Sequence, residues 1–148
     1  MADQATQKMV IGASPQRCFD TVVDFERYPT WARDLKEASV VRRDDEGRGV
    51  EVVFRAAAMG RSTSYTLRYD YSDAPRKVSW ELARGDIMRQ LDGHYEFLPV
   101  DGDPESTEVV YTLKVDLVVP LPGFVKRRAE ARIINNALRE LRAHLEPR

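Results

Sequence analysis

Apolar and polar positions change their spacing twice along this chain, which divides it into three parts. Residues 4–11 have the character of a strand. The segment Gly12-Ala13-Ser14-Pro15 follows and is typical of a helix start, with Ser14 as the N-cap and Pro15 at the first helical position. The first part of the chain therefore begins with a strand that leads directly into a helix.

Two short helices are predicted in this first part. One side of the first helix would carry four apolar residues, namely Cys18, Phe19, Val22 and Val23. The Tyr28-Pro29 pair should end that helix, because a residue before proline is disfavoured in helical geometry. Thr30 can then cap a further turn that runs through Trp31 and Leu35.

The middle part, from Glu37 to Asp116, predicts six strands. Turn-forming clusters separate them, at residues 44–47, 59–60, 72–75, 84–86 and 101–104. Apolar residues alternate with polar ones in four clear runs: Val50, Val52 and Phe54; Thr63, Tyr65, Leu67 and Tyr69; Val78, Trp80 and Leu82; and Val109, Tyr111, Leu113 and Val115. Such alternation is typical of an antiparallel sheet with one face in water. Gly93 interrupts one strand and predicts a bulge or bend.

The last part predicts a long amphipathic helix from Pro122 to about Leu145. Its apolar stripe has steps of three and four, through Ala131, Ile134, Leu138, Leu141 and Leu145. Extending the stripe backwards reaches Arg127 and then Phe124, so we expect one cation near the helix start to point inward. Lys126, Arg127 and Arg128 all lie near the helix N-terminus, whose partial positive charge disfavours cations. Another interaction must therefore make these three cations tolerable or useful.

Composition limits the classes of function. A chain of 148 residues is long enough for one domain with one core, and we expect a single domain over residues 1–148. The formal net charge of −1 argues against a protein that grips nucleic acid. Cys18 is the only cysteine, which fits a reducing, cytoplasmic setting, and no segment resembles a signal peptide or a membrane span. The preference for Arg over Lys hints at a bacterial source.

These elements together predict an α+β fold. One strand, two short helices, six further strands and one long helix would form a curved, seven-stranded antiparallel sheet wrapped on the C-terminal helix. Such an arrangement encloses a concave space that is either packed or left open as a cavity.

The sequence resembles the START-like superfamily with the helix-grip fold, in particular its bacterial polyketide cyclase/dehydrase and lipid-transport branch, whose relatives include the birch pollen allergen. The resemblance spans nearly the whole chain. It rests on the order and spacing of five groups of residues: 13–15 with 23–31, 78–81, 91–97, 106–111 and 120–124. Members of this superfamily share a fold and differ in function, so the resemblance implies a hydrophobic cavity and no particular reaction.

The resemblance implies a module that binds or transports a small hydrophobic ligand such as a lipid, polyketide, isoprenoid quinone or fatty acid. The alternative is an enzyme, a polyketide cyclase or dehydratase that uses cavity Tyr and Arg residues. Regulation through contact with another protein also fits the fold, although no apolar strip outside the Pro-rich segment before the last helix supports it. We expect a monomer or a homodimer, and no cofactor.

Nine residues are candidates for ligand binding, and for each an ordinary structural role remains open. Trp31, Phe54, Tyr65, Trp80, Tyr95 and Tyr111 would line a pocket or else fill a closed core. Phe124 is a candidate in the Pro-rich segment at the start of the last helix. Arg127 would pair with an acidic ligand or else extend to water with its stem packed on Phe124. Asn135 is a weaker polar candidate beside the stripe.

The cations near the start of the last helix have a second possible use. Lys126, Arg127 and Arg128 form a candidate patch for transient contact with an anionic membrane. The alternative is a solvated face in which Lys126 pairs with Glu130, four residues on.

No arrangement of catalytic residues stands out. Tyr65, Tyr95 and His94 are weak candidates, and alternation sends His94 to the outer face unless Gly93 forms a bulge. His94 and His144 are too isolated to predict a metal site, and Cys18 fits a small core residue.

Overall fold

The computed structural model describes residues 4–58, 61–118 and 122–146. In chain order the elements are β1 (Ala5–Ile11), α1 (Pro15–Val22), the 3₁₀ helix η1 (Phe25–Thr30), β2 (Leu35–Arg43), β3 (Gly49–Ala58), β4 (Arg61–Asp70), β5 (Lys77–Gly85), β6 (Met88–Val100), β7 (Asp103–Leu117) and α2 (Gly123–Leu145). The predicted α+β architecture, with seven strands, two short helices and a long final helix, is confirmed.

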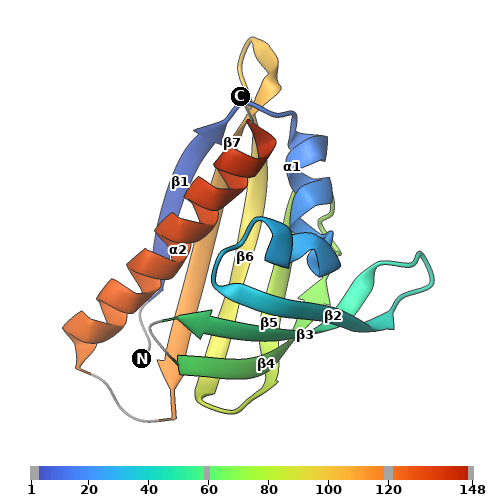
Figure 1. Cartoon of the computed structure of the whole chain (residues 1–148). Coiled ribbons are helices and arrows are strands. Elements are labelled where there is room, and N and C mark those ends of the chain that lie inside the picture. Colours follow the sequence, from blue (N-terminus) through green and yellow to red (C-terminus); the bar gives the residue numbers. More distant parts are fainter. Residues whose placement is uncertain (1–3, 59–60, 119–121, 147–148) are drawn as a thin grey trace.

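All seven strands form one antiparallel sheet in the order β1-β7-β6-β5-β4-β3-β2. Figure 1 shows the sheet curving strongly, with α2 lying along β1 and β7 and with β2 to β5 turned away from that helix. This is the helix-grip arrangement. The curvature separates α2 from β3 and β4, so a space between them has to be filled by side chains or left open.

The first helix begins where the sequence predicts. The Ser14 hydroxyl accepts a hydrogen bond from the Arg17 N–H at 3.3 Å, and Pro15 is the first helical residue. Cys18, Phe19 and Val22 are buried as expected. The Cys18 thiol is a free, buried group whose pKa is raised by burial, as suits a small core residue.

The second short helix lies earlier than predicted. It is η1, which contains the Tyr28-Pro29 pair instead of starting after it. Proline is tolerated because the short 3₁₀ turn makes few backbone hydrogen bonds that need the missing N–H. The Thr30 hydroxyl donates to the Arg27 carbonyl at 2.6 Å, so Thr30 closes this turn and does not cap a new helix.

Charged side chains cover the outer face of the sheet. Cross-strand register places Glu51 opposite Arg68 and Arg68 opposite Glu81, and both acidic side chains pair with that arginine, at 3.8 Å and 3.3 Å. Arg42 on β2 also contacts Glu51, at 3.3 Å. The prediction of one wet face is therefore confirmed, and the apolar side chains of the same strands point to the concave side.

Gly93 marks a close approach of three strands. The β6–β7 pairing runs through Gly93 without a register shift, so the predicted bulge is absent there. The β5–β6 pairing ends at Trp80 and Gly93, however. Beyond this point the Leu82 N–H of β5 donates to the Asp92 side-chain carboxylate of β6, at 2.9 Å. The sheet thus opens beside Gly93, which agrees with the expected bend.

The buried stripe of α2 contains a carboxylate. Ile134, Leu138, Leu141 and Leu145 are buried as predicted, but Ala131 is only partly buried, and the buried residue nearest the helix start is Glu130, 1% exposed. Its Oε2 accepts a hydrogen bond from the Val115 N–H of β7 at 2.9 Å. The alternative in which Lys126 pairs with Glu130 at the surface is therefore wrong, because Glu130 points into the protein.

At its other end α2 is tied to the first connection of the chain. The Glu146 carboxylate accepts a hydrogen bond from the Gly12 N–H, which lowers the pKa of Glu146. Within the parts of the chain that the structure describes, no helix is long and apolar enough to cross a membrane.

Candidate functional site: an aromatic cavity under the long helix

A cavity of about 370 Å³ lies between α2 and the concave face of the sheet, and the connection from η1 to β2 closes one side. This volume is within the range of pockets that hold small organic ligands. The cavity exists because α2 packs on β1 and β7 at one edge while β3 and β4 curve away. Small residues on the helix, Ala129 and Ala137, line it and leave room.

Cross-strand register builds the aromatic wall of the cavity. Phe54 lies opposite Tyr65, Tyr69 opposite Trp80, and Tyr95 opposite Tyr111. The ring centroids of these pairs are 5.6 Å, 5.8 Å and 4.4 Å apart, respectively. Trp80 also contacts Tyr95 and Tyr111 at 5.6 Å and 5.7 Å, which joins two pairs into one surface. Such a wall offers a large apolar area with stacking geometry for a flat ligand.

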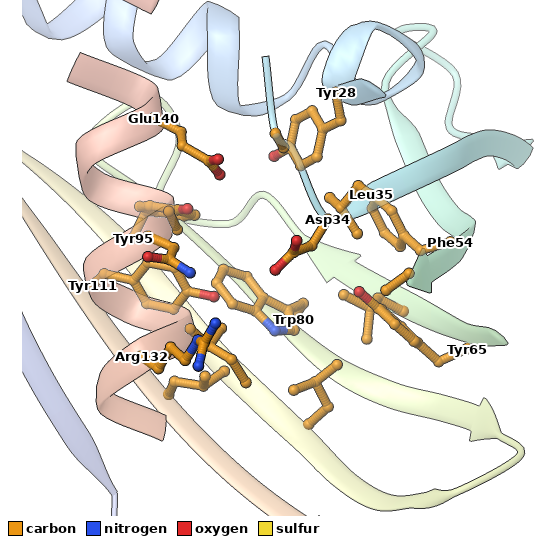
Figure 2. A pocket seen from close by; sticks show the side chains of 18 of the residues that line it. Tyr28, Asp34, Leu35, Phe54, Tyr65, Trp80, Tyr95, Tyr111, Arg132 and Glu140 are labelled. Carbon is orange, nitrogen blue, oxygen red and sulfur yellow. The ribbon is translucent and has the colours of Figure 1, made fainter. Parts of the chain in front are cut away.

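Neutral hydrogen-bonding groups face the cavity. Figure 2 shows the Tyr65 and Tyr111 hydroxyls directed toward the space around Trp80. Burial raises the pKa of Tyr65, Tyr95 and Tyr111, so these phenols stay neutral at ordinary pH. The tyrosine hydroxyl bonds found among the described residues are those of Tyr28 and Tyr71, so a ligand oxygen would find donors at these three hydroxyls.

Tyr28 differs from the other tyrosines of the lining. Its hydroxyl donates to the Val22 carbonyl at the end of α1 and is therefore already satisfied. Its ring lies 5.0 Å from Trp31 and 5.8 Å from Phe54. Tyr28 thus fixes η1 against the sheet and presents only its ring to the cavity.

Charged groups lie at the mouth of the cavity and not in its interior. Asp34, in the connection just before β2, and Arg132 are exposed, and Glu140 is half-buried. The Glu140 carboxylate accepts a hydrogen bond from the Arg33 N–H at 3.2 Å, which connects α2 to the η1–β2 connection. In Figure 2 Asp34 and Glu140 lie above the Trp80 ring and Arg132 lies below it.

Six of the nine predicted ligand-binding residues line the cavity. They are Trp31, Phe54, Tyr65, Trp80, Tyr95 and Tyr111. The structure thus brings together six of the seven aromatic candidates, although their part in binding stays a prediction. Phe124, Arg127 and Asn135 are exposed and do not belong to the lining, and Phe124 is 58% exposed.

The expectation that Arg127 points inward is wrong. Arg127 does lie one turn before Glu130 on the buried side of α2, but Figure 1 shows the first turns of this helix extending beyond β1. With little sheet beneath it, the guanidinium folds back along its own helix toward Gly123. Helical spacing identifies a face, whereas burial also requires a neighbouring element.

The neighbouring cations are accessible as well. Arg128 is exposed and Lys126 half-buried, and no salt bridge to Lys126, Arg127 or Arg128 occurs within the described part of the chain. Contact of these cations with an anionic membrane stays a prediction, which sedimentation with anionic vesicles would test. The Pro-rich segment before α2 includes residues 119–121, which lie outside the described residues.

The weak catalytic candidate His94 lies outside the lining of the cavity. Its Nε2 is 3.3 Å from a Glu96 carboxylate oxygen on the same strand, and its neighbour Tyr95 faces inward. Burial, followed by the nearby Lys77, lowers the pKa of His94. No group of His, Cys, Asp and Glu suited to a metal ion is found among the residues that the structure describes.

Sequence reasoning missed the charged residues of the mouth. Arg132, Asn136 and Glu140 follow Ala129 at helical steps and form a second stripe, beside the buried one. The small residues within it, Ala129 and Ala137, were the available signal, because a helix face with small side chains cannot fill a concave sheet. Asp34 carried no signal, since it stands in a connection.

A curved antiparallel sheet around a long C-terminal helix, with an aromatic cavity between them, defines a START-like protein of the helix-grip class. The sequence model of the family described as polyketide cyclase / dehydrase and lipid transport matches residues 2–146. The chain belongs to this family. A search of curated protein sequences finds no match.

Solved structures share the fold along their whole length. A START superfamily protein from Mycobacterium smegmatis is 21% identical, with 96% of each chain covered and a TM-score of 0.90. The ZhuI aromatase/cyclase from Streptomyces sp. R1128 is 15% identical, with 98% of this chain and 92% of that chain covered and a TM-score of 0.79. Major latex-like protein 151 from Panax ginseng is 10% identical, with 99% of each chain covered and a TM-score of 0.72. At these identities the similarity establishes the fold alone.

Proposed function

We propose that this protein binds a small hydrophobic ligand in the cavity between the sheet and α2, and carries or presents it. The observation that supports this most directly is the cavity of about 370 Å³ with a continuous aromatic wall. Apolar interiors normally pack to high density, so a space of this size within the core region sacrifices packing that a purely structural domain would keep. A ligand that fills the space would restore those contacts.

The lining also indicates how a ligand would be held. Rings of Phe54, Trp80 and Tyr95 offer flat apolar surface, whereas the Tyr65 and Tyr111 hydroxyls offer directional hydrogen bonds. Ligands with a flat or flexible apolar body and one or two oxygen atoms fit this combination. Polyketides, isoprenoid quinones and fatty acids share that chemistry, and the choice among them is an experimental question.

The first experiment is mass spectrometry of an organic extract of the protein purified from its native host, beside a mock purification. We expect a hydrophobic compound in stoichiometric amount. The matched control is Ala137→Phe, which places a ring in the cavity from α2 and should abolish the co-purifying compound, because the space is then occupied.

A clean extract would be followed by titration with 2-acetylnaphthalene, monitored by the fluorescence of Trp31 and Trp80, which both line the cavity. Binding by the wild type and its loss in Ala137→Phe would support the proposal. Equal signals from both proteins would contradict it, since the probe would then bind elsewhere.

The second candidate is a polyketide cyclase or dehydratase, favoured by ionisable groups at the mouth of the cavity. Asp34 and Glu140 could move a proton, while a tyrosine hydroxyl stabilises an enolate oxygen. Incubation with a poly-β-ketone substrate would show a cyclised or dehydrated product, lost in Tyr95→Phe. Absence of turnover in the presence of demonstrated binding would leave the binding function alone.

A further inference from the structure

The mouth of the cavity is electrically polarised, and its positive side is formed by one arginine. We propose that Arg132 recognises a carboxylate at one end of the ligand, whose apolar body lies against the aromatic wall. This inference rests on the proposed ligand-binding function and narrows the ligand to an amphipathic monoanion. It assigns to Arg132 the role that helical spacing suggested for Arg127.

Arg132 reaches the cavity, whereas the other cations of the same helix half do not. Its side chain is part of the lining, and Figure 2 shows it extending from α2 toward the space below Tyr111 and Trp80. Arg127, five residues earlier, is exposed and lies outside the lining. Position along α2 therefore separates two arginines of equal charge by their access to a bound ligand.

Arg132 has no acidic partner within the described residues, where the salt bridges engage other side chains. Arginines farther along α2 do have partners: Arg139 donates to the Asn136 side chain at 2.6 Å, and Arg142 contacts Glu146 at 3.5 Å. A guanidinium is a planar fork of donors that matches a carboxylate in two parallel hydrogen bonds. The guanidinium of Arg132 is thus available to a ligand.

The charges around the mouth orient an anionic ligand. α2 contains six Lys and Arg residues and two Glu residues, a net charge of +4, although the whole chain has −1, so the rest of the chain carries −5. Three of those cations, at positions 126–128, lie within two turns of Arg132. The two carboxylates of the mouth, on Asp34 and Glu140, lie on the other side in Figure 2 and would repel an anion.

Among the described residues of the lining, the charged ones lie at the mouth and none competes in the interior. The polar groups of the interior include the indole N–H of Trp80 and four phenols that stay neutral because burial raises their pKa, those of Tyr65, Tyr69, Tyr95 and Tyr111. Burying an ionised carboxylate among neutral groups is costly, so an acidic end group would remain at the mouth while the body enters. Arg132 is then the group that distinguishes a charged ligand from a neutral one of the same shape.

The test compares 4-(2-naphthyl)butanoate with its primary amide, two probes of nearly the same shape that differ in charge. Affinities are measured by tryptophan fluorescence at pH 7.5 for the wild type, Arg132→Gln, Arg132→Lys and Arg127→Gln. We expect the wild type to bind the acid about 3- to 10-fold more tightly than the amide, as suits a charge-assisted pair at a partly exposed site. In Arg132→Gln the two probes should bind equally.

Arg127→Gln is the matched control, because it removes the same charge from the same helix at a position outside the cavity. It should keep the wild-type preference for the acid, which separates direct pairing from the general field of α2. Arg132→Lys should keep part of the preference, since an ammonium is a point charge without the planar fork. Because Arg132 is exposed, its variants should unfold at the wild-type temperature.

Two outcomes would overturn the inference, and they differ in what they say about the proposed function. If both probes bind but Arg132→Gln keeps the preference for the acid, ligand binding stands and Arg132 is not the recognition residue. If neither probe binds the wild type, while ligand extraction is also negative, the proposed function fails and the inference fails with it.

Discussion

Glu130 is the residue whose environment differs most from what its type suggests. It is 1% exposed, and its Oε2 holds the Val115 N–H of β7 at 2.9 Å, where α2 covers the sheet. A buried carboxylate is costly to desolvate, but a buried backbone N–H without a partner is costly as well. The Glu130 side chain therefore connects α2 to β7 through a hydrogen bond, close to the lining residues Ala129 and Ile133.

We predict that Glu130→Ala lowers the free energy of unfolding by about 1–3 kcal/mol, because it leaves the Val115 N–H unsatisfied and opens a small void. Urea titration followed by circular dichroism measures the change. The control is Glu37→Ala, which removes an exposed carboxylate 3.3 Å from Arg55 and should cost at most about 1 kcal/mol. Equal losses of stability in the two variants would show that the buried hydrogen bond of Glu130 contributes no more than a surface ion pair.

His94 makes stability depend on pH. Burial first, and then the nearby Lys77, lowers the pKa of His94 in the folded protein below its ordinary value. The folded state therefore binds this proton less readily than the unfolded state does. The resulting contribution to stability is fully present above the ordinary histidine pKa and is lost as the pH falls toward the folded pKa.

We therefore predict that the wild type is less stable at pH 5 than at pH 8, and that His94→Gln loses less stability over the same interval. Chemical unfolding at the two pH values measures both differences. The comparison between proteins isolates His94, since the carboxylates are unchanged. An identical loss in wild type and variant would rule out a contribution from this side chain.

At the scale of the strands, Gly93 permits the approach that opens the sheet. A Cβ at this position would lie 2.3 Å from the Thr112 carbonyl oxygen of β7 and 2.9 Å from the Trp80 ring. Backbone of a paired strand cannot move away as a side chain can. Trp80 therefore crosses Gly93 at the place where β5 leaves β6, and this crossing positions the indole in the cavity wall.

We predict that Gly93→Ala costs about 1–3 kcal/mol of stability through overpacking and also weakens binding of 2-acetylnaphthalene, because Trp80 must shift. Thermal unfolding and the fluorescence titration measure the two effects. Gly85→Ala is the control within β5, since its Cβ would come no closer than 3.4 Å to any neighbour. If both variants behave alike, the close approach at Gly93 has no consequence for the site.

Element by element, the sequence predicted most of the fold, because the signals were local. Ser14 and Pro15 mark a helix start by their own geometry, and alternation in β3, β4 and β7 assigns each side chain to a face. The predictions were wrong where a neighbouring element determines the position or the exposure of a segment. The position of η1 and the exposure of Arg127 both depend on what lies beside the segment and not on its own spacing.

At the scale of the whole molecule, the candidate site combines predicted and unpredicted residues. Its aromatic wall was predictable, since six aromatic residues occupy inward positions of strands or the η1–β2 connection. The grouping of Arg132, Asp34 and Glu140 at one mouth was not. Asp34 lies in the connection before β2, whereas Arg132 and Glu140 lie on different turns of α2. Only the path of the helix over the sheet brings the three residues together.

Along the strands, the sequence by itself determined which side chains point inward, because the alternation of side chains is a property of the local backbone. It also determined the order of elements and the excess of positive charge on α2. Only the tertiary structure decided that the inward side chains do not meet. Sheet curvature and the distance of α2 from β3 and β4 arise from long-range packing, and a cavity is the volume that such packing leaves unfilled.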